Sequence, residues 1–255
     1  MTEYADHHAP AGLRTRGTVL VVPGRGETPA TYGRLGRRLA ADAYRVRVTD
    51  APDLDATDLP GSLARFGARL AAAVEGAAGD EGVVRPVVLV GADSGAAALA
   101  ALLGRAGTPA VVAPDAVVLA GLPGRAGAKT DSWDDELDVR TSCPTHRAVL
   151  TEDRGVRRGA LDATLPAALL TAVHDAALPV PALLLAGDAD PLADHESLVR
   201  TAAALPRARL SLVRGARHDV LNDLQHRSVA AEIVTFLETL RNELRPLITV
   251  ASSAW

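Results

Sequence analysis

The feature that most constrains the fold of this chain is an apolar run that enters a tight, glycine-flanked turn and continues into an alanine-rich stretch. It covers residues 87–97, VVLVGADSGAA. The four apolar residues predict a buried strand, and the alanine-rich stretch predicts a helix. A strand-turn-helix with the pattern G-x-nucleophile-x-G holds its tip residue on a strained backbone above the carboxyl end of a sheet. The segment therefore predicts an α/β sheet with a functional residue at this turn.

The tip of the turn can be placed in two ways. With Gly91 and Gly95 as the flanking residues, Asp93 is at the tip, and both flanks lack the Cβ that would clash there. Centring the turn on Ser94 places alanines at the flanks, which the turn tolerates, but the last strand residue then comes one position late. We therefore place Asp93 at the tip.

Short runs rich in valine and leucine alternate with stretches whose apolar residues recur at helical spacing. Strands that are almost continuously apolar and separated by helices predict a parallel sheet covered on both faces. We therefore expect an α/β fold with a doubly wound, mostly parallel sheet, and a last helix at residues 224–244. The predicted strands are residues 18–22, 44–48, 87–90, 116–120, 182–186 and 209–213.

Composition limits the classes of protein that this chain can belong to. Its 255 residues, 48% of them hydrophobic, are enough for one domain over residues 1–255. A net charge of −4 without long runs of one sign gives no reason to expect nucleic acid as a partner, and no apolar run approaches a membrane span. The single cysteine excludes an internal disulfide, and the polar start lacks a secretory signal, so we expect a cytoplasmic protein. The oligomeric state stays open.

No pattern in the sequence calls for a metal or an organic cofactor, and we expect neither. The adjacent His7 and His8 are the nearest approach to a metal motif, but no cysteine or second group of ligands accompanies them. We interpret this pair as part of a solvated amino-terminal tail.

One interval is longer than the alternating pattern requires. About sixty residues separate the strands ending at 120 and beginning at 182, where a simple crossover needs far fewer. We predict a lid at about residues 123–178, which would shape a substrate pocket and exclude water. The alternative is an irregular surface excursion with solvated charges. Trp133, His146 and Arg147 lie in this interval, and we interpret them as packing and solvated residues outside the site.

Two later segments each place a titratable residue directly after a predicted strand. Residues 183–191, LLLAGDADP, end in two carboxylates, Asp188 and Asp190, and residues 213–219, VRGARHD, bring His218 just beyond the last strand. The order of tip residue, acid and histidine along the chain is that of an α/β-hydrolase triad.

The segments 187–191 (GDADP) and 215–223 (GARHDVLND) resemble the acid and histidine loops of α/β-hydrolases of the monoacylglycerol-lipase and serine-aminopeptidase type. The resemblance covers about residues 18–240. It implies that Asp190 is the triad acid and His218 the triad base. Asp188 is the alternative acid, but it lies two residues early in this pattern and can instead cap the following helix or turn. Residues 23–28, PGRGET, correspond to the family's oxyanion loop, so the resemblance implies an oxyanion hole made by the backbone N–H groups of Arg25 and Ser94.

The chain departs from this subfamily at the tip, where Asp93 stands in place of serine. A carboxylate is ionised near neutral pH and can attack without a base. Attack at a saturated carbon would give an alkyl ester that His218, oriented by Asp190, helps to hydrolyse, as in haloalkane dehalogenases and epoxide hydrolases. Those families stabilise the leaving atom with a tryptophan after the nucleophile or with lid tyrosines, and this chain has Ser94 after Asp93 and no tyrosine in the lid.

Three alternatives remain beside a nucleophilic Asp93. Asp93 and His218 could form an acid-base unit that catalyses cyclisation, dehydration, isomerisation or carbon-carbon cleavage without a covalent intermediate. Ser94 could act as the nucleophile of a serine esterase. The chain could also be an inactive scaffold that binds a ligand. We predict an enzyme acting on a small organic substrate, most simply by hydrolysis, with Asp93, His218 and Asp190 as catalytic residues.

Overall fold

The computed structural model describes residues 4–104, 113–124, 127–174 and 176–253. Its centre is a seven-stranded sheet in the order β1-β3-β2-β4-β5-β6-β7. Neighbouring strands are parallel except at one edge, where β1 and β3 are antiparallel. All six predicted strands are present, with ends shifted by at most two residues. The strands are β1 (Ala5–His7), β2 (Gly17–Val22), β3 (Tyr44–Val48), β4 (Val87–Ala92), β5 (Ala116–Ala120), β6 (Ala182–Gly187) and β7 (Ala208–Val213).

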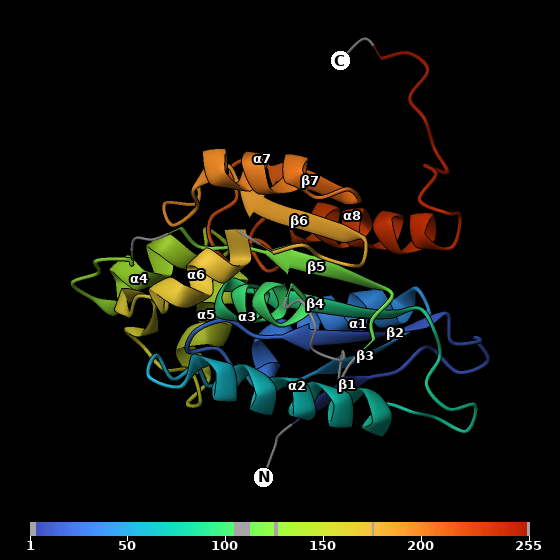
Figure 1. Cartoon of the computed structure of the whole chain (residues 1–255), viewed down its shortest axis with the longest axis horizontal. Coiled ribbons are helices and arrows are strands. Elements are labelled where there is room, and N and C mark those ends of the chain that lie inside the picture. Colours follow the sequence, from blue (N-terminus) through green and yellow to red (C-terminus); the bar gives the residue numbers. More distant parts are fainter. Residues whose placement is uncertain (1–3, 105–112, 125–126, 175, 254–255) are drawn as a thin grey trace.

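Helices cover both faces of the sheet, so the predicted doubly wound α/β fold is confirmed (Figure 1). Along β2, Leu20 and Val22 pack into a core shared with α2, α3, α6 and α7, whereas Val19 and Val21 pack into a core shared with α1 and α8. The helices are α1 (Gly33–Ala41), α2 (Leu59–Gly76), α3 (Asp93–Leu103), α4 (Trp133–Arg140), α5 (Pro144–Glu152), α6 (Ala167–His174), α7 (His195–Ala204) and α8 (His226–Leu240), with short 3-10 helices η1 (Pro29–Tyr32) and η2 (Ala160–Asp162).

The turn between β4 and α3 has the backbone that its sequence predicts. Asp93 has a φ of 46°, in the left-handed region that side chains other than glycine rarely adopt. A Cβ on Gly91 would lie 2.6 Å from the backbone nitrogen of Ala96, and one on Gly95 would lie 2.6 Å from the carbonyl oxygen of Pro23. Only glycine therefore fits at either flank of the tip.

The position of this turn in the sheet is where ligands bind in many α/β proteins. β2 pairs with β3 on one side and with β4 on the other, so the chain reverses its direction of travel across the sheet at β2. The crevice outside the carboxyl ends of strands at such a switch point is the usual ligand site in open α/β sheets. Asp93, directly after β4, lies at this point.

The predicted lid, residues 123–178, is helical in large part. α4, α5, η2 and α6 belong to it, and the three α-helices lie beyond the end of the sheet toward which the strand arrows point (Figure 1). We call this segment the cap; its positions 125, 126 and 175 are outside the described residues. Leu137, Leu150 and Val156 form a small buried cluster within it, so an irregular excursion is the wrong description.

The amino-terminal end is not a solvated tail, and that interpretation is wrong. Ala5–His7 forms β1, which pairs with β3 in the register Ala5 with Val48 and His7 with Val46. Asp6 also forms an ion pair with Arg47 at 2.6 Å. Three residues are too few to show an alternating pattern, so this strand cannot be recognised from its residues alone.

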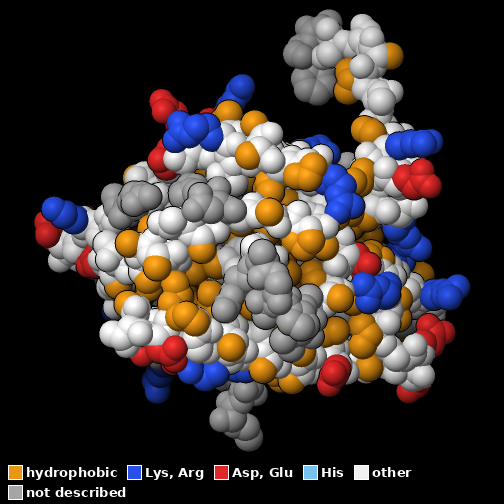
Figure 2. All heavy atoms as spheres, in the orientation of Figure 1, with side chains coloured by type: hydrophobic (Ala, Val, Ile, Leu, Met, Phe, Trp, Pro, Cys, Tyr) orange, Lys and Arg blue, Asp and Glu red, His pale blue; other side chains and the backbone are white. Residues whose placement is uncertain are grey.

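The distribution of surface charge and the length and hydrophobicity of the helices are relevant to which partners the protein can bind. On the face drawn in Figure 2, basic and acidic side chains are interspersed rather than gathered in one patch. None of the described helices is both long and apolar enough to cross a membrane. The segment after α8 stands away from the body of the molecule in Figure 1.

Candidate active site

Three segments that follow the carboxyl ends of β4, β6 and β7 bring the three predicted catalytic residues together. Asp93 begins α3 after β4, Asp190 follows β6, and His218 follows β7. His218 Nδ1 lies 2.9 Å from Asp190 Oδ2, and His218 Nε2 lies 3.2 Å from Asp93 Oδ1. All three side chains are buried. The arrangement is a histidine held between two carboxylates, with the tip residue on the side where a triad nucleophile belongs.

The neighbouring Asp188 does not reach this site. Its Oδ1 accepts a hydrogen bond from the backbone N–H of Gly215 at 2.6 Å, which ties the turn after β6 to the turn after β7. Of the two carboxylates in this turn, Asp190 therefore is the one placed to orient His218.

Both oxygens of Asp93 are bound by a guanidinium. Arg25 Nε donates to Oδ2 and Arg25 Nη2 donates to Oδ1, each at 2.8 Å, which makes a bidentate ion pair. The side chains of Arg25 and Asp93 are only 7% and 5% exposed, so little solvent screens this pair. From the sequence, only the backbone N–H of Arg25 is expected in the site. The signal for a role of its side chain is an arginine in a glycine-rich loop that is predicted to face a carboxylate.

The same interactions set the charge of the two central groups. Burial alone would raise the pKa of Asp93, but the Arg25 guanidinium and the hydrogen bond from His218 outweigh it and hold the pKa far below its usual range. Burial would lower the pKa of His218, but Asp190 and Asp93 outweigh it and raise the pKa to about 10. At neutral pH, Asp93 is ionised and His218 is an imidazolium that donates from both ring nitrogens.

The predicted oxyanion loop lies against Asp93. The backbone N–H of Arg25 donates to Asp93 Oδ2 at 2.8 Å, so the group expected to bind a substrate oxyanion binds the carboxylate of the tip residue. Ser94 is buried in the first turn of α3. The two ring nitrogens of His218 are taken by Asp190 and Asp93 and leave no position to activate the Ser94 hydroxyl.

Arg25 also links the site to the cap. Its Nη1 donates to the carbonyl oxygen of Leu161 at 3.3 Å and to that of Ala163. In return, Arg140 Nη2 from α4 donates to the carbonyl oxygen of Arg25 at 2.8 Å. The oxyanion loop, the tip residue and the cap are therefore one hydrogen-bonded unit.

The space beside the site is small. A cavity of about 10 Å³ borders Asp93, His218, Tyr32 and Asp219, which is room for about one water molecule. The cap also holds the histidine loop, because the backbone N–H of Asp219 donates to the carbonyl oxygen of Arg140 at 2.8 Å. A substrate larger than water does not fit in this cavity.

Solved structures share this architecture. A monoacylglycerol lipase from Paleococcus ferrophilus superposes with a TM-score of 0.68 at 17% identity, covering 94% of this chain and 99% of the lipase. A soluble variant of monoglyceride lipase from Saccharomyces cerevisiae, in complex with a substrate analog, gives a TM-score of 0.69 at 15% identity, covering 94% of this chain and 92% of that one. This chain has the α/β-hydrolase fold.

Other comparisons agree with this α/β-hydrolase fold. A type II thioesterase of the yersiniabactin biosynthetic pathway superposes with a TM-score of 0.58 at 19% identity, covering 93% of this chain and 98% of that one. Residues 162–245, which include Asp190 and His218, match the family described as TAP-like protein. No curated protein matches the chain in sequence. The expected scaffold is confirmed, and the chemistry must be argued from the site itself.

Proposed function

We propose that this α/β-hydrolase-fold protein is an enzyme that acts on a small organic molecule by acid-base chemistry at Asp93, His218 and Asp190. The observation that carries the proposal is the imidazole of His218 between two carboxylates, with hydrogen bonds to both. In this role Asp190 orients the ring and Asp93 is the counter-ion that keeps the proton on His218 Nε2. His218 donates that proton to the substrate once the substrate has displaced Asp93 Oδ1 from Nε2. Hydrolysis, cyclisation, dehydration and isomerisation all begin with a proton transfer of this kind.

An acid-base role suits Asp93 better than a nucleophilic one. Its carboxylate accepts four hydrogen bonds, three from Arg25 and one from His218. Each bond stabilises the ionised carboxylate and takes up a lone pair that attack on carbon would need. The low pKa of Asp93 also makes it a weak base. Proton donation by His218, with Arg25 stabilising negative charge nearby, uses these groups in the states in which the fold holds them.

A second candidate is a ligand-binding protein without catalysis. It is favoured by the ion pair with Arg25 that occupies the Asp93 carboxylate. Against it stands the complete Asp190–His218 pair, which a scaffold that only binds does not need. In the catalytic proposal, the cap moves to admit substrate, and the contacts of Arg25 with the cap carbonyls break as it does so.

We predict that substitutions at Arg25 and Asp93 give this site esterase activity, with His218 as the general base. Asp93→Ser alone leaves Arg25 buried without its partner, so the variant to make is Arg25→Ala with Asp93→Ser. We expect the wild type to be inactive on p-nitrophenyl acetate and butyrate. The double variant should hydrolyse both esters at least about 100-fold faster than the background rate measured with the wild type, because a positioned general base contributes roughly 10²–10⁴-fold.

Ser94→Ala in the wild-type background is the matched control for this assay. Wild-type hydrolysis that Ser94→Ala abolishes would make the chain a serine esterase and contradict the proposal. Inactivity of a folded double variant would show that His218, Asp190 and the oxyanion loop are not assembled for catalysis, and would favour the ligand-binding candidate.

The choice between acid-base and covalent chemistry has its own test. If Asp93 were a nucleophile, His218→Gln would trap an alkyl ester, because the residue that activates water for its hydrolysis is missing. We expect the intact mass of His218→Gln to stay unchanged after incubation with 1-bromobutane or styrene oxide. A mass increase located at Asp93, and lost in Asp93→Asn with His218→Gln, would assign the covalent role instead.

A further inference from the structure

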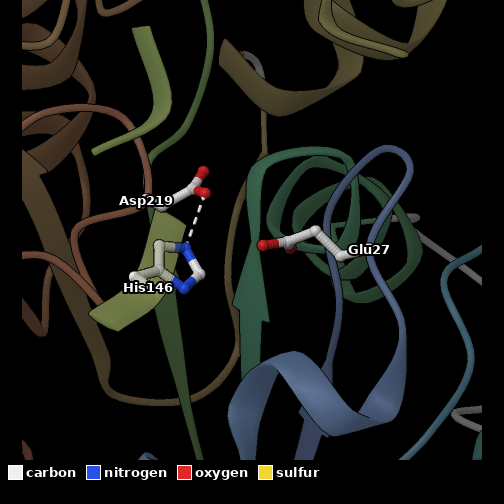
Figure 3. Close-up of side chains that lie close together, drawn as sticks. All are labelled: Glu27, His146 and Asp219. Atoms are coloured by element: carbon white, nitrogen blue, oxygen red, sulfur yellow. Dashed lines mark hydrogen bonds and ion pairs between the residues drawn. The ribbon is translucent and has the colours of Figure 1, made fainter. Parts of the chain in front are cut away.

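A second group of buried titratable side chains lies beside the candidate active site and has no part in it. Glu27 belongs to the oxyanion loop, His146 to α5 in the cap, and Asp219 to the loop after β7. One ligand atom from each lies within 4.8 Å of those of the other two. Figure 3 shows the Glu27 carboxylate directed toward His146 and Asp219. The three segments are distant in the chain, and the fold alone brings these side chains together.

The protein binds one oxygen of the Glu27 carboxylate and leaves the other without a partner. Glu27 Oε2 accepts hydrogen bonds from the backbone N–H of Gly24 at 2.8 Å and from the Tyr32 hydroxyl. Glu27 Oε1 is buried without a hydrogen-bond partner among the described residues, and the residue is 7% exposed. A buried carboxylate oxygen with no donor is costly, so this atom points to something that the protein atoms do not supply.

Asp219, in contrast, has a partner at each carboxylate oxygen. Its Oδ1 lies 3.6 Å from Arg140 Nη1, and its Oδ2 lies 2.9 Å from His146 Nε2 (Figure 3). Outer contacts that fix a ligand's orientation, such as those of Arg140 on Asp219 and of Tyr32 on Glu27, accompany most protein metal sites.

The buried charges of this group and its neighbours are net negative, and a bound cation would balance them. The Arg140 guanidinium pairs with Glu136 at 2.9 Å and faces Asp219 at 3.6 Å. With Glu27, three buried carboxylates share this one guanidinium, which leaves two negative charges when His146 is neutral. Without a cation, a proton on Glu27 Oε1 is the alternative that would reduce this charge. A divalent cation would neutralise the group completely.

We propose that Glu27, His146 and Asp219 form a binding site for a divalent transition metal, with Zn²⁺ as the best fit. One imidazole and two carboxylates are a donor set that Zn²⁺ accepts. Ligand atoms around a four-coordinate zinc lie roughly 3.4 Å apart for bonds of about 2.1 Å. On binding, His146 Nε2 and Asp219 Oδ2, now 2.9 Å apart, would separate, and ligand atoms that are up to 4.8 Å apart would approach one another. A water molecule would supply the fourth ligand.

Such an ion would fasten the cap to the catalytic loops. It would join α5 to the oxyanion loop, two residues after Arg25, and to the histidine loop, one residue after His218. Because the ligands come from three separate segments, the folded chain binds the ion and the unfolded chain does not, so binding adds to stability.

The test is zinc binding by the full-length chain without an affinity tag, stripped with EDTA, dialysed and titrated calorimetrically with Zn²⁺. We expect one ion per chain, and an affinity at least about 10-fold weaker in the isosteric Glu27→Gln and in His146→Gln, since loss of even an outer partner costs 10–100-fold. His8→Gln, at an exposed histidine, is the control and should bind like the wild type.

Binding of no zinc by the wild type would overturn the site and leave Glu27 holding a proton. Unchanged binding by folded Glu27→Gln and His146→Gln would overturn it as well. If these variants do not fold, X-ray absorption at the zinc edge of the wild type decides: one imidazole with oxygen ligands supports the site, and two or more imidazoles contradict it.

Discussion

Replacing Arg25 by methionine is expected to lower the free energy of unfolding by about 3–5 kcal/mol, the usual cost of breaking a buried ion pair from one side. The loss arises because Asp93 stays buried at 5% exposure without the guanidinium that binds both of its oxygens. Urea denaturation of the wild type and Arg25→Met measures it. Arg65→Met is the control, because Arg65 pairs with Asp58 on the surface at 60% exposure, and such pairs contribute at most about 1 kcal/mol.

A double-variant cycle separates the ion pair from packing. The single variant Arg25→Met leaves the Asp93 charge buried without a partner, and adding Asp93→Asn removes that charge. The double variant should therefore lose less stability than the sum of the two single losses. Strictly additive losses would mean that Arg25 stabilises the fold through its contacts with the cap carbonyls alone. The ion pair with Arg25 would then not be the interaction that holds Asp93 in the site.

The second large effect is the dependence of stability on pH. The pKa of His218 rises from 6.5 to about 10 on folding, because Asp190 and Asp93 together outweigh the effect of burial. A raised pKa gives stability that is fully present below pH 6.5 and is lost as the pH rises through 10. The free energy of unfolding should therefore fall by on the order of 5 kcal/mol over this range, since one pKa unit corresponds to 1.36 kcal/mol.

His218→Gln isolates this contribution, because all other groups titrate in both proteins. Urea denaturation of the EDTA-treated proteins across this pH range should give a stability difference between wild type and variant that shrinks as the pH rises. A difference that stays constant with pH would mean that His218 is neutral in the folded state, and the acid-base proposal would lose its proton donor.

The sheet and the candidate catalytic residues could be predicted because their signals are local. Each strand is a continuous apolar run, and Asp93, Asp190 and His218 each follow such a run, so parallel pairing alone brings them to one edge. The short edge strand β1 could not be predicted, since Ala5–His7 depends on pairing with β3 and not on its own pattern.

The side-chain contacts between distant segments could not be predicted either. From the sequence, His146 is expected to be a packing or solvated residue of the lid. The structure instead places its imidazole against Asp219, 73 positions along the chain. Likewise, the guanidinium of Arg25 meets Asp93 because Gly24 of the oxyanion loop and Gly95 of α3 allow the loop and the first turn of α3 to approach closely. No periodic pattern encodes which side chains face one another across such a junction.

The charge of His218 tests the central claim most directly, because it reports the site without knowledge of the substrate. Nitrogen NMR of histidine-labelled, EDTA-treated protein at about pH 8 distinguishes an imidazolium from a neutral ring, and His218→Gln assigns the signal. We predict that both ring nitrogens of His218 are protonated there, and that Asp93→Asn lowers its pKa. A neutral His218 at this pH, titrating near 6.5 as a free imidazole does, would contradict the assembled Asp93–His218–Asp190 site.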